Sequence, residues 1–213
     1  MEISWLGHSC FRIRSGQTTI VTDPFPSDLG YNLGKQLAHI VTVSHQHPNH
    51  AFAEGVGGEP RVIRSPGEYE ISSALIMGLA AFHDDQRGAE RGKNTIYLIE
   101  IDGISVCHLG DIGHPLSAAH LEEMEEVDIL LIPVGGVTTI GAVSAAEIIR
   151  RVEPRVAIPM HYGTPVVSGL DPVDKFLREM GQEQVEAQPK LTVSRSGMQA
   201  GGTQVCVLDY KEV

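Results

Sequence analysis

The sequence is poor in basic residues, and this limits the partners that it can have. Its 16 Lys and Arg are outnumbered by 27 Asp and Glu, which gives the 213-residue chain a formal net charge of −11. Binding along nucleic acid or on anionic lipid requires clustered Lys and Arg. We therefore expect no nucleic acid and no membrane as partners and favour a small-molecule substrate. Whether the chain forms a homo-oligomer stays open.

Long apolar runs are also lacking, and we expect no leader segment. No segment approaches the roughly 20 consecutive apolar residues of a membrane-spanning helix. Residues 1–5 contain neither the basic region nor the apolar stretch of a secretory signal. The sequence therefore predicts a cytoplasmic protein.

Cysteines are few, and their positions argue against a disulfide framework. Cys10, Cys107 and Cys206 are odd in number, far apart and surrounded by apolar residues that are typical of strands. This pattern predicts reduced core residues rather than disulfides or a redox motif. With 42% hydrophobic residues and no linker-like segment, residues 1–213 are expected to form a single domain with one substantial core.

The first half of the sequence reads mainly as strands. Short apolar or β-branched runs predict strands at residues 2–6, 10–13, 18–22, 40–44, 61–64, 74–82, 94–101 and 104–109. Asp102-Gly103 stands between the last two runs. This pair suits a two-residue type I′ turn, in which both central residues need positive φ, so the two strands should be antiparallel neighbours.

Helices alternate with strands in the second half. Ser117 is a candidate cap for a helix that extends to about Val127, and Ser144 with Glu147 has the spacing of a capping box. Asp171-Pro172 predicts a cap followed by proline at the first helical position, with Gly181 closing that helix. Strands are expected between and after these helices, at residues 128–133, 155–160, 191–194 and 204–208.

Three histidines within six positions are the most informative feature. His45, His47 and His50 directly follow the apolar run at residues 39–43, which reads as a buried strand. Residues two apart on extended backbone point to the same side, and the turn at Pro48-Asn49 can bring His50 back toward them. Because imidazole is the commonest protein ligand for zinc, the cluster predicts a metal site; the plainer alternative is a coincidental polar loop.

Other candidate ligands also stand where predicted strands end. His83 follows one strand, Asp111 follows another after Gly110, and His161 ends a third. Function in layered α/β folds gathers at such strand ends. A lone His or Asp there can instead be a cap or turn residue.

Taken in order, these motifs resemble those of the metallo-β-lactamase fold hydrolases, in particular the small single-domain, lactonase-like cytosolic members. The similarity covers essentially the whole chain and is carried by Trp5-Leu6-Gly7-His8-Ser9, Asp23-Pro24-Phe25, the H-x-H-x-D-H region from Ser44 to His50, Gly110-Asp111 and Met160-His161-Tyr162. The resemblance implies an α/β fold, a four-layer αβ/βα sandwich of two mixed β-sheets flanked by helices. It also implies a metal site at the edge between the two halves.

The resemblance further implies a set of ligands. His45, His47 and His83 would hold a first metal, and His50, Asp111 and His161 a second, with Asp111 bridging the two and accepting a proton. His108 competes with His83 as the third ligand. We prefer His83, because residues three apart on a strand, such as His108 and Asp111, point to opposite faces.

His8 is expected to line the same site, where it would support a ligand or contact substrate. Two loops could also contact substrate. The segment at residues 84–95 carries Arg87, Arg91 and Lys93, which would receive an anionic group or simply form a solvated surface. The segment at residues 135–139 offers backbone N–H groups and hydroxyls.

One position departs from the family pattern. Asn49 stands where the H-x-H-x-D-H motif has its aspartate, and an amide brings neither negative charge nor a proton acceptor at neutral pH. The second metal site is therefore expected to be weakened, with Asn49 as a doubtful ligand. Alternatively, Asn49 caps a short helix that starts at His50.

We expect a metal-dependent hydrolase that uses a metal-bound hydroxide on a small ester, lactone or phosphodiester. The cofactor would be one or two divalent ions, with zinc favoured and manganese or iron as alternatives. The competing hypothesis is a catalytically impaired metal-binding or non-enzymatic domain that keeps the fold, with Asn49 as the lesion.

Overall fold

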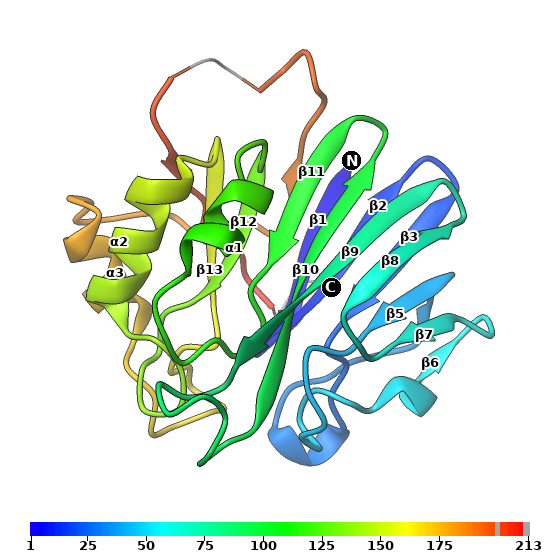
Figure 1. Ribbon diagram of the computed structural model, residues 1–213, viewed down its shortest axis with the longest axis horizontal. Helices are drawn as coiled ribbons and strands as arrows, with labels where there is room; N and C mark the ends of the chain where they lie inside the picture. Colours follow the sequence, from blue (N-terminus) through cyan, green and yellow to red (C-terminus); the bar gives the residue numbers. More distant parts are fainter. Residues whose placement is uncertain (199–200, 211–213) are drawn as a thin grey trace.

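The computed structural model describes residues 1–198 and 201–210 and contains two large mixed sheets (Figure 1). The first sheet has the strand order β14-β1-β2-β3-β5-β7. Its first four strands are antiparallel neighbours, whereas β3, β5 and β7 are parallel. The bounds are β1 Glu2–Gly7, β2 Cys10–Ser15, β3 Thr18–Thr22, β5 Ile40–Thr42, β7 Arg61–Ile63 and β14 Leu191–Thr192.

The second sheet has the order β15-β13-β12-β11-β10-β9-β8. The pairs from β8 to β11 are antiparallel and those from β11 to β15 are parallel. The bounds are β8 Gly67–Ile71, β9 Ala74–Phe82, β10 Lys93–Ile101, β11 Ile104–His108, β12 Ile129–Pro133, β13 Val156–Met160 and β15 Gln204–Val205. A two-stranded sheet pairs β4 Gln36–Leu37 with β6 Val56–Gly57.

The α-helices of the described chain lie in its second half. They are α1 Ala118–Glu123, α2 Ala142–Val152 and α3 Val173–Glu179, and Figure 1 shows them grouped beside the β11 to β13 part of the second sheet. Residues 1–117 contribute only the 3-10 turns η1 Ser27–Leu29 and η2 Ala53–Gly55. The expected αβ/βα sandwich of two mixed sheets is therefore confirmed, with most of its helical covering on the second sheet.

The main core lies between the two sheets. One continuous cluster of buried side chains joins Trp5 and Phe11 of the first sheet to Ile96, Tyr97 and Leu130 of the second. These large apolar side chains exclude water from the facing sheet surfaces, which stabilises their packing. Cys10, Cys107 and Cys206 are all buried and free, as the sequence predicts.

The strand predictions for the first half are largely confirmed. The turn residues Asp102 and Gly103 have φ of 52° and 69°, and Ile101 pairs with Ile104 across the hairpin. The strand predicted at residues 40–44 ends earlier, at Thr42, because the Ser44 backbone N–H donates to the Asp23 carboxylate instead of to a neighbouring strand.

Two helix starts were wrongly predicted. The helix α2 begins at Ala142 with Gly141 as its cap, so Ser144 lies inside the helix and forms no capping box. Pro172 is itself the extended cap of α3, and Asp171 forms an ion pair with Lys175 one turn on. The caps of these two helices are therefore Gly141 and Pro172 rather than the predicted Ser144 and Asp171.

The helix α1 does begin after Ser117, which forms a capping box with His120, but it ends at Glu123 rather than near Val127. Glutamates at positions 122, 123, 125 and 126 lie at this end. Negative charge there is unfavourable because the helix dipole is negative at its C-terminus.

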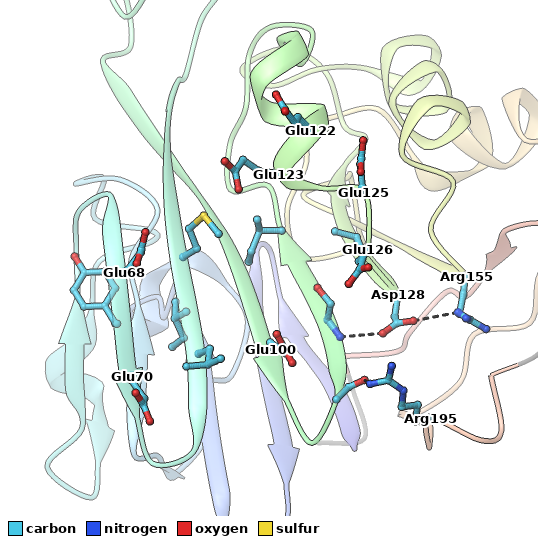
Figure 2. A pocket seen from close by; sticks show the side chains of 18 of the residues that line it. Glu68, Glu70, Glu100, Glu122, Glu123, Glu125, Glu126, Asp128, Arg155 and Arg195 are labelled. Atoms are coloured by element: carbon cyan, nitrogen blue, oxygen red, sulfur yellow. Dashed lines mark hydrogen bonds and ion pairs between the residues drawn. The ribbon is translucent and has the colours of Figure 1, made fainter.

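A groove lies between β8 to β10 and α1 (Figure 2). It has a volume of about 1040 Å³, and nine acidic residues and two arginines line it. Leu75, Met77 and Leu98 are among the apolar residues that line it. Figure 2 shows Glu68, Glu70 and Glu100 on the strands and four glutamates at and after the end of α1. No histidine is among the residues that line this groove.

The longest of the described helices, α2, has 11 residues. A membrane-spanning helix needs roughly 20 residues, so none of the described helices could cross a bilayer.

Candidate metal centre

The three clustered histidines lie in the loop that follows β5. The ring centroids of His45 and His50 are 4.3 Å apart, and His47 lies 6.1 Å from each of them. His50 is buried, His45 is half-buried and His47 is exposed. The backbone N–H of His50 donates to the His47 carbonyl over 2.9 Å, so the turn brings the three rings together.

Asp111 lies at the centre of the arrangement. Its Oδ2 is 3.0 Å from His161 Nε2, 3.3 Å from His50 Nε2 and 3.4 Å from His83 Nε2. The other oxygen, Oδ1, accepts a hydrogen bond of 3.2 Å from Ser9 Oγ. Burial on its own would raise the pKa of Asp111, but His161 and His50 hold it well below its ordinary value. The carboxylate is therefore ionised and faces three imidazoles.

The backbone before Asp111 needs glycine. Gly110 has φ of 58°, and a Cβ there would lie 2.3 Å from Asn94 Oδ1 and 2.6 Å from the Ser44 Cβ. Only a residue without a side chain fits this contact and this conformation. The Asp111 backbone N–H then donates to Asn94 Oδ1 over 3.0 Å, which fixes the carboxylate between the two sheets.

Asp23 holds the other side of His50. Its Oδ2 lies 2.9 Å from His50 Nδ1, and its two oxygens accept the backbone N–H and the hydroxyl of Ser44. Burial alone would lower the pKa of His50, but the carboxylates of Asp111 and Asp23 raise it to about 10. Sequence reasoning quoted Asp23 only as part of a motif and assigned it no role. Its position directly after the strand at residues 18–22 is the same strand-end signal that identified His83 and Asp111.

The structure separates the two competitors for one ligand position. His83 follows β9, lies beside Asp111 and has its ring centroid 4.7 Å from that of His45. One ligand atom each of His45, His83 and Asp111 lies within 4.8 Å of the others. His108 is fully buried at the end of β11, where its Nε2 lies 2.8 Å from the Ser9 carbonyl oxygen. His83, and not His108, contacts Asp111.

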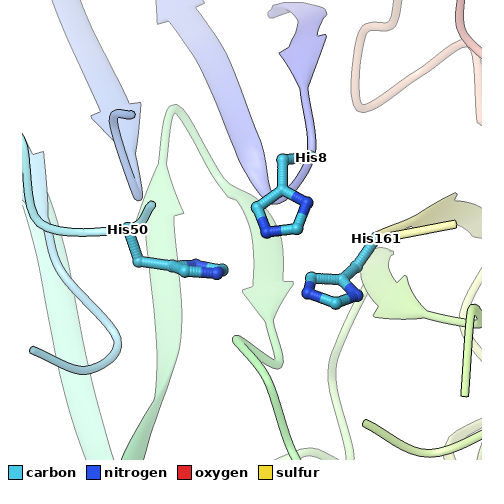
Figure 3. Close-up of side chains that lie close together, drawn as sticks. All are labelled: His8, His50 and His161. Atoms are coloured by element: carbon cyan, nitrogen blue, oxygen red, sulfur yellow. The ribbon is translucent and has the colours of Figure 1, made fainter. Parts of the chain in front are cut away.

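His8 also lies beside His50 and His161. The ring centroid of His8 is 4.1 Å from that of His161 and 4.8 Å from that of His50 (Figure 3). One ring nitrogen of each lies within 4.8 Å of the others. His8 and His161 both have positive φ, 53° and 51°, and such strained backbone is concentrated at functional sites.

The donor set fits a divalent cation. Five buried ring nitrogens have no hydrogen-bond partner among the described residues. Four belong to the centre, namely His8 Nδ1, His45 Nε2, His83 Nδ1 and His161 Nδ1, and the fifth is His108 Nδ1 at the end of β11. Buried polar atoms without partners are rare, because leaving them unpaired costs free energy. Burial first, and the proximity of His50 second, lower the pKa of His45 to about 3, so its imidazole is neutral. Neutral imidazoles and ionised carboxylates are the ligand forms that metals bind, so His50, whose pKa is about 10, must release a proton when an ion binds.

Asn49 belongs to the turn rather than to a helix. Its backbone N–H donates to His47 Nδ1 over 3.3 Å, and no helix begins at His50. The prediction that Asn49 caps a helix there is wrong, because the chain makes a single turn before η2.

The two predicted substrate loops lie next to the centre. Asp84 accepts four backbone N–H groups of the loop that follows His83, at distances of 2.7 to 3.0 Å. The side chains of Arg87, Arg91 and Lys93 are all exposed. In the loop after β12, Gly135 approaches the backbone of His161 so closely that a Cβ would lie 2.1 Å from its carbonyl oxygen.

Comparison with known proteins agrees with this geometry. A family description, the β-lactamase superfamily domain, matches residues 2–161. The chain is 32% identical over 205 residues to a UPF0173 protein of Pyrococcus furiosus, with coverage of 87% of this chain and 93% of the relative. It is 28% identical over 211 residues to a UPF0173 metal-dependent hydrolase of Methanopyrus kandleri, with coverage of 84% and 91%.

A crystal structure from Thermotoga maritima, of a protein assigned to the Zn-dependent hydrolases of the metallo-β-lactamase superfamily, superposes with a TM-score of 0.80. It is 38% identical to this chain, and the match covers 98% of this chain and 99% of the other. Fold and centre together define the class as the metal-dependent hydrolases of the metallo-β-lactamase fold. The chain belongs to the β-lactamase superfamily domain family.

Proposed function

We propose that this protein hydrolyses a small ester, lactone or phosphodiester at the centre around Asp111, with one or two divalent ions, zinc being favoured. The observation that carries the proposal is the convergence of three histidine Nε2 atoms on one buried carboxylate oxygen. Such a group of imidazoles and carboxylate is the donor set of hydrolytic metal sites.

In this proposal His45, His47 and His83 hold the first ion, and His50 and His161 hold the second. Asp111 lies between the two groups and serves both. Two observations support this division. The ligand atoms of His45, His83 and Asp111 form one group within 4.8 Å, and His161 Nε2 and His50 Nε2 lie 3.0 and 3.3 Å from Asp111 Oδ2. Asp23 keeps the His50 ring oriented by accepting from its second nitrogen.

When bound, a zinc-type ion lowers the pKa of a coordinated water to about 7 and polarises the group to be cleaved. The protein supplies position and proton transfer. Ser9 donates to Asp111 Oδ1, which leaves Oδ2 directed at the histidines and placed to accept a proton. The low pKa of Asp111 keeps it ionised near neutral pH, which is the form that binds a cation.

The test combines metal analysis with a substrate screen. Protein purified without chelators is expected to contain one or two zinc ions per chain and to hydrolyse at least one member of a panel of lactones, esters and phosphodiesters. His45→Ala should lose metal and lower hydrolysis by at least 100-fold, because it removes a ligand of the first ion. His39→Ala is the matched control, since His39 is an exposed histidine on the same segment.

The alternative raised by Asn49, an impaired metal-binding domain, predicts a different result. Wild-type protein would then bind metal but hydrolyse nothing in the panel above the rate of His45→Ala. Hydrolysis that His45→Ala leaves unchanged would contradict the proposed site.

A further inference from the structure

We propose that His8 replaces the missing motif aspartate as a ligand of the second ion, so that His8, His50, His161 and Asp111 form that site. The inference rests on the proposed function. Asn49 stands where the family motif has an aspartate ligand. We infer that His8, which follows β1, supplies the ligand in its place.

The first support is geometry. The ring of His8 lies against those of His161 and His50, with centroid distances of 4.1 and 4.8 Å, and Figure 3 shows the three rings around a common space. One nitrogen of each ring lies within 4.8 Å of the others. Zinc–nitrogen bonds of about 2.1 Å require tetrahedral ligand atoms to be roughly 3.4 Å apart, so the three nitrogens would have to come closer together when an ion binds.

The second support is that the backbone of His8 is fixed in place. Its carbonyl oxygen accepts hydrogen bonds from Trp5 Nε1 over 2.9 Å and from the His161 backbone N–H over 3.1 Å. Gly7 has φ of 115°, and a Cβ there would lie 2.5 Å from the Tyr31 ring. The turn therefore holds His8 and His161 side by side, although they come from different sheets.

The third support is an unpaired donor or acceptor. His8 is only 6% exposed, and its Nδ1 has no hydrogen-bond partner among the described residues. A histidine that only packed against other rings would not need two polar nitrogens in a buried place, where each costs free energy when unpaired. A coordinated cation would satisfy this site.

Replacing a carboxylate ligand by an imidazole also affects which metal the second site prefers. A neutral imidazole in place of a carboxylate gives the second ion three nitrogens and one carboxylate. Nitrogen ligands favour zinc, whereas carboxylate and water oxygens favour manganese and magnesium. The second site should therefore bind zinc in preference to manganese.

The experiment counts zinc ions per chain in the wild type and three variants. Each protein is stripped of metal, refilled with zinc, dialysed and analysed by mass spectrometry of the metal, and competition with a chromogenic chelator gives the two affinities. His8→Ala removes the ring. His8→Phe is the packing control, because it keeps an aromatic ring against His161 but has no ring nitrogen.

We expect two zinc ions in the wild type and one in both His8→Ala and His8→Phe, with the affinity of the remaining ion within threefold of the wild-type value. The double variant His8→Ala/Asn49→Asp should bind two again, because the restored carboxylate supplies the lost ligand. A retained first ion also shows that the single variants fold.

Two zinc ions of unchanged affinity in both single variants would overturn the role of His8 and leave the proposed function intact. A single zinc ion in the wild type would overturn it as well, while still allowing a one-ion hydrolase. An absence of zinc from the wild type would instead contradict the proposed function itself.

Discussion

Asp23 and Asp111 contact His50 at its two ring nitrogens, so neither the position nor the rotation of this ring is free. Ser44 completes the arrangement by donating twice to Asp23. A carboxylate behind a metal-binding histidine fixes the tautomer and increases the basicity of the ligand nitrogen. Asp23 and Ser44 therefore determine the orientation of His50 in the centre.

The effect of Asp23 can be measured by Asp23→Asn. The amide keeps the shape but loses the charge, so the affinity of the ion held by His50 should fall roughly 10- to 100-fold. Zinc competition titration measures this change. Asp28→Asn, at an exposed position in η1, is the control and should leave the affinity unchanged. Equal affinities in both variants would show that Asp23 only stabilises the fold.

Three of the candidate ligands lie just after the ends of strands of the second sheet. His83 directly follows β9, Asp111 is the third residue after β11, and His161 directly follows β13. The loop from His83 to Gly92 stays in place because Asp84 accepts four of its backbone N–H groups. Burial would raise the pKa of Asp84, but these four bonds lower it to about 2.

Asp84→Asn should therefore loosen this loop. An amide presents an NH₂ group to N–H donors on one side, so two of the four bonds are lost. We expect a lower Tm and faster hydrogen exchange at Gln86, Gly88, Glu90 and Arg91. The neighbouring Asp85 is exposed, and Asp85→Asn should change neither measurement. Unaltered exchange in Asp84→Asn would show that the loop is held by other contacts.

The elements with regular apolar patterns could be predicted from the sequence. The strands β3 and β9 have the predicted bounds, and the Asp102-Gly103 turn pairs β10 with β11. The strand β8 was missed, because its residues, Gly67–Ile71, are all exposed or half-buried and lack an apolar face. It is an edge strand whose formation depends on pairing with β9, and sequence pattern does not reveal such pairing.

In the candidate site, too, local features could be predicted from the sequence and long-range contacts could not. The cluster at His45, His47 and His50 is local and visible in the sequence. The contacts of Asp23 with His50 and of His8 with His161 join residues 27 and 153 positions apart, so they depend on how the chain folds. Local spacing could not predict them.

At the scale of the whole molecule, charge is distributed unevenly. The groove of Figure 2 is lined by nine acidic residues and two arginines, in a chain whose net charge is −11. Asp128 is paired with Arg155 at 3.1 Å, but the glutamates around α1 lie close to one another. Repulsion between exposed like charges destabilises the folded state and is screened by salt.

The protein should therefore become more stable as ionic strength rises. Screening that recovers about 1 kcal/mol would raise the Tm by roughly 2–4 °C between 10 and 200 mM NaCl. Thermal unfolding followed by circular dichroism measures this effect. Glu122→Gln/Glu123→Gln should reduce the salt dependence, whereas Glu54→Gln, an exposed control in η2, should not. A Tm that falls with salt would show that attractive pairs dominate.

The most direct test of the central claim is the metal content and hydrolytic activity of the wild type beside His45→Ala. The centre around Asp111 predicts one or two zinc ions per wild-type chain and hydrolysis of a lactone, ester or phosphodiester. His45→Ala should lose the first ion and the hydrolysis, and His39→Ala should retain both. Wild-type protein that binds no metal, and shows no hydrolysis that His45→Ala abolishes, would contradict the assignment.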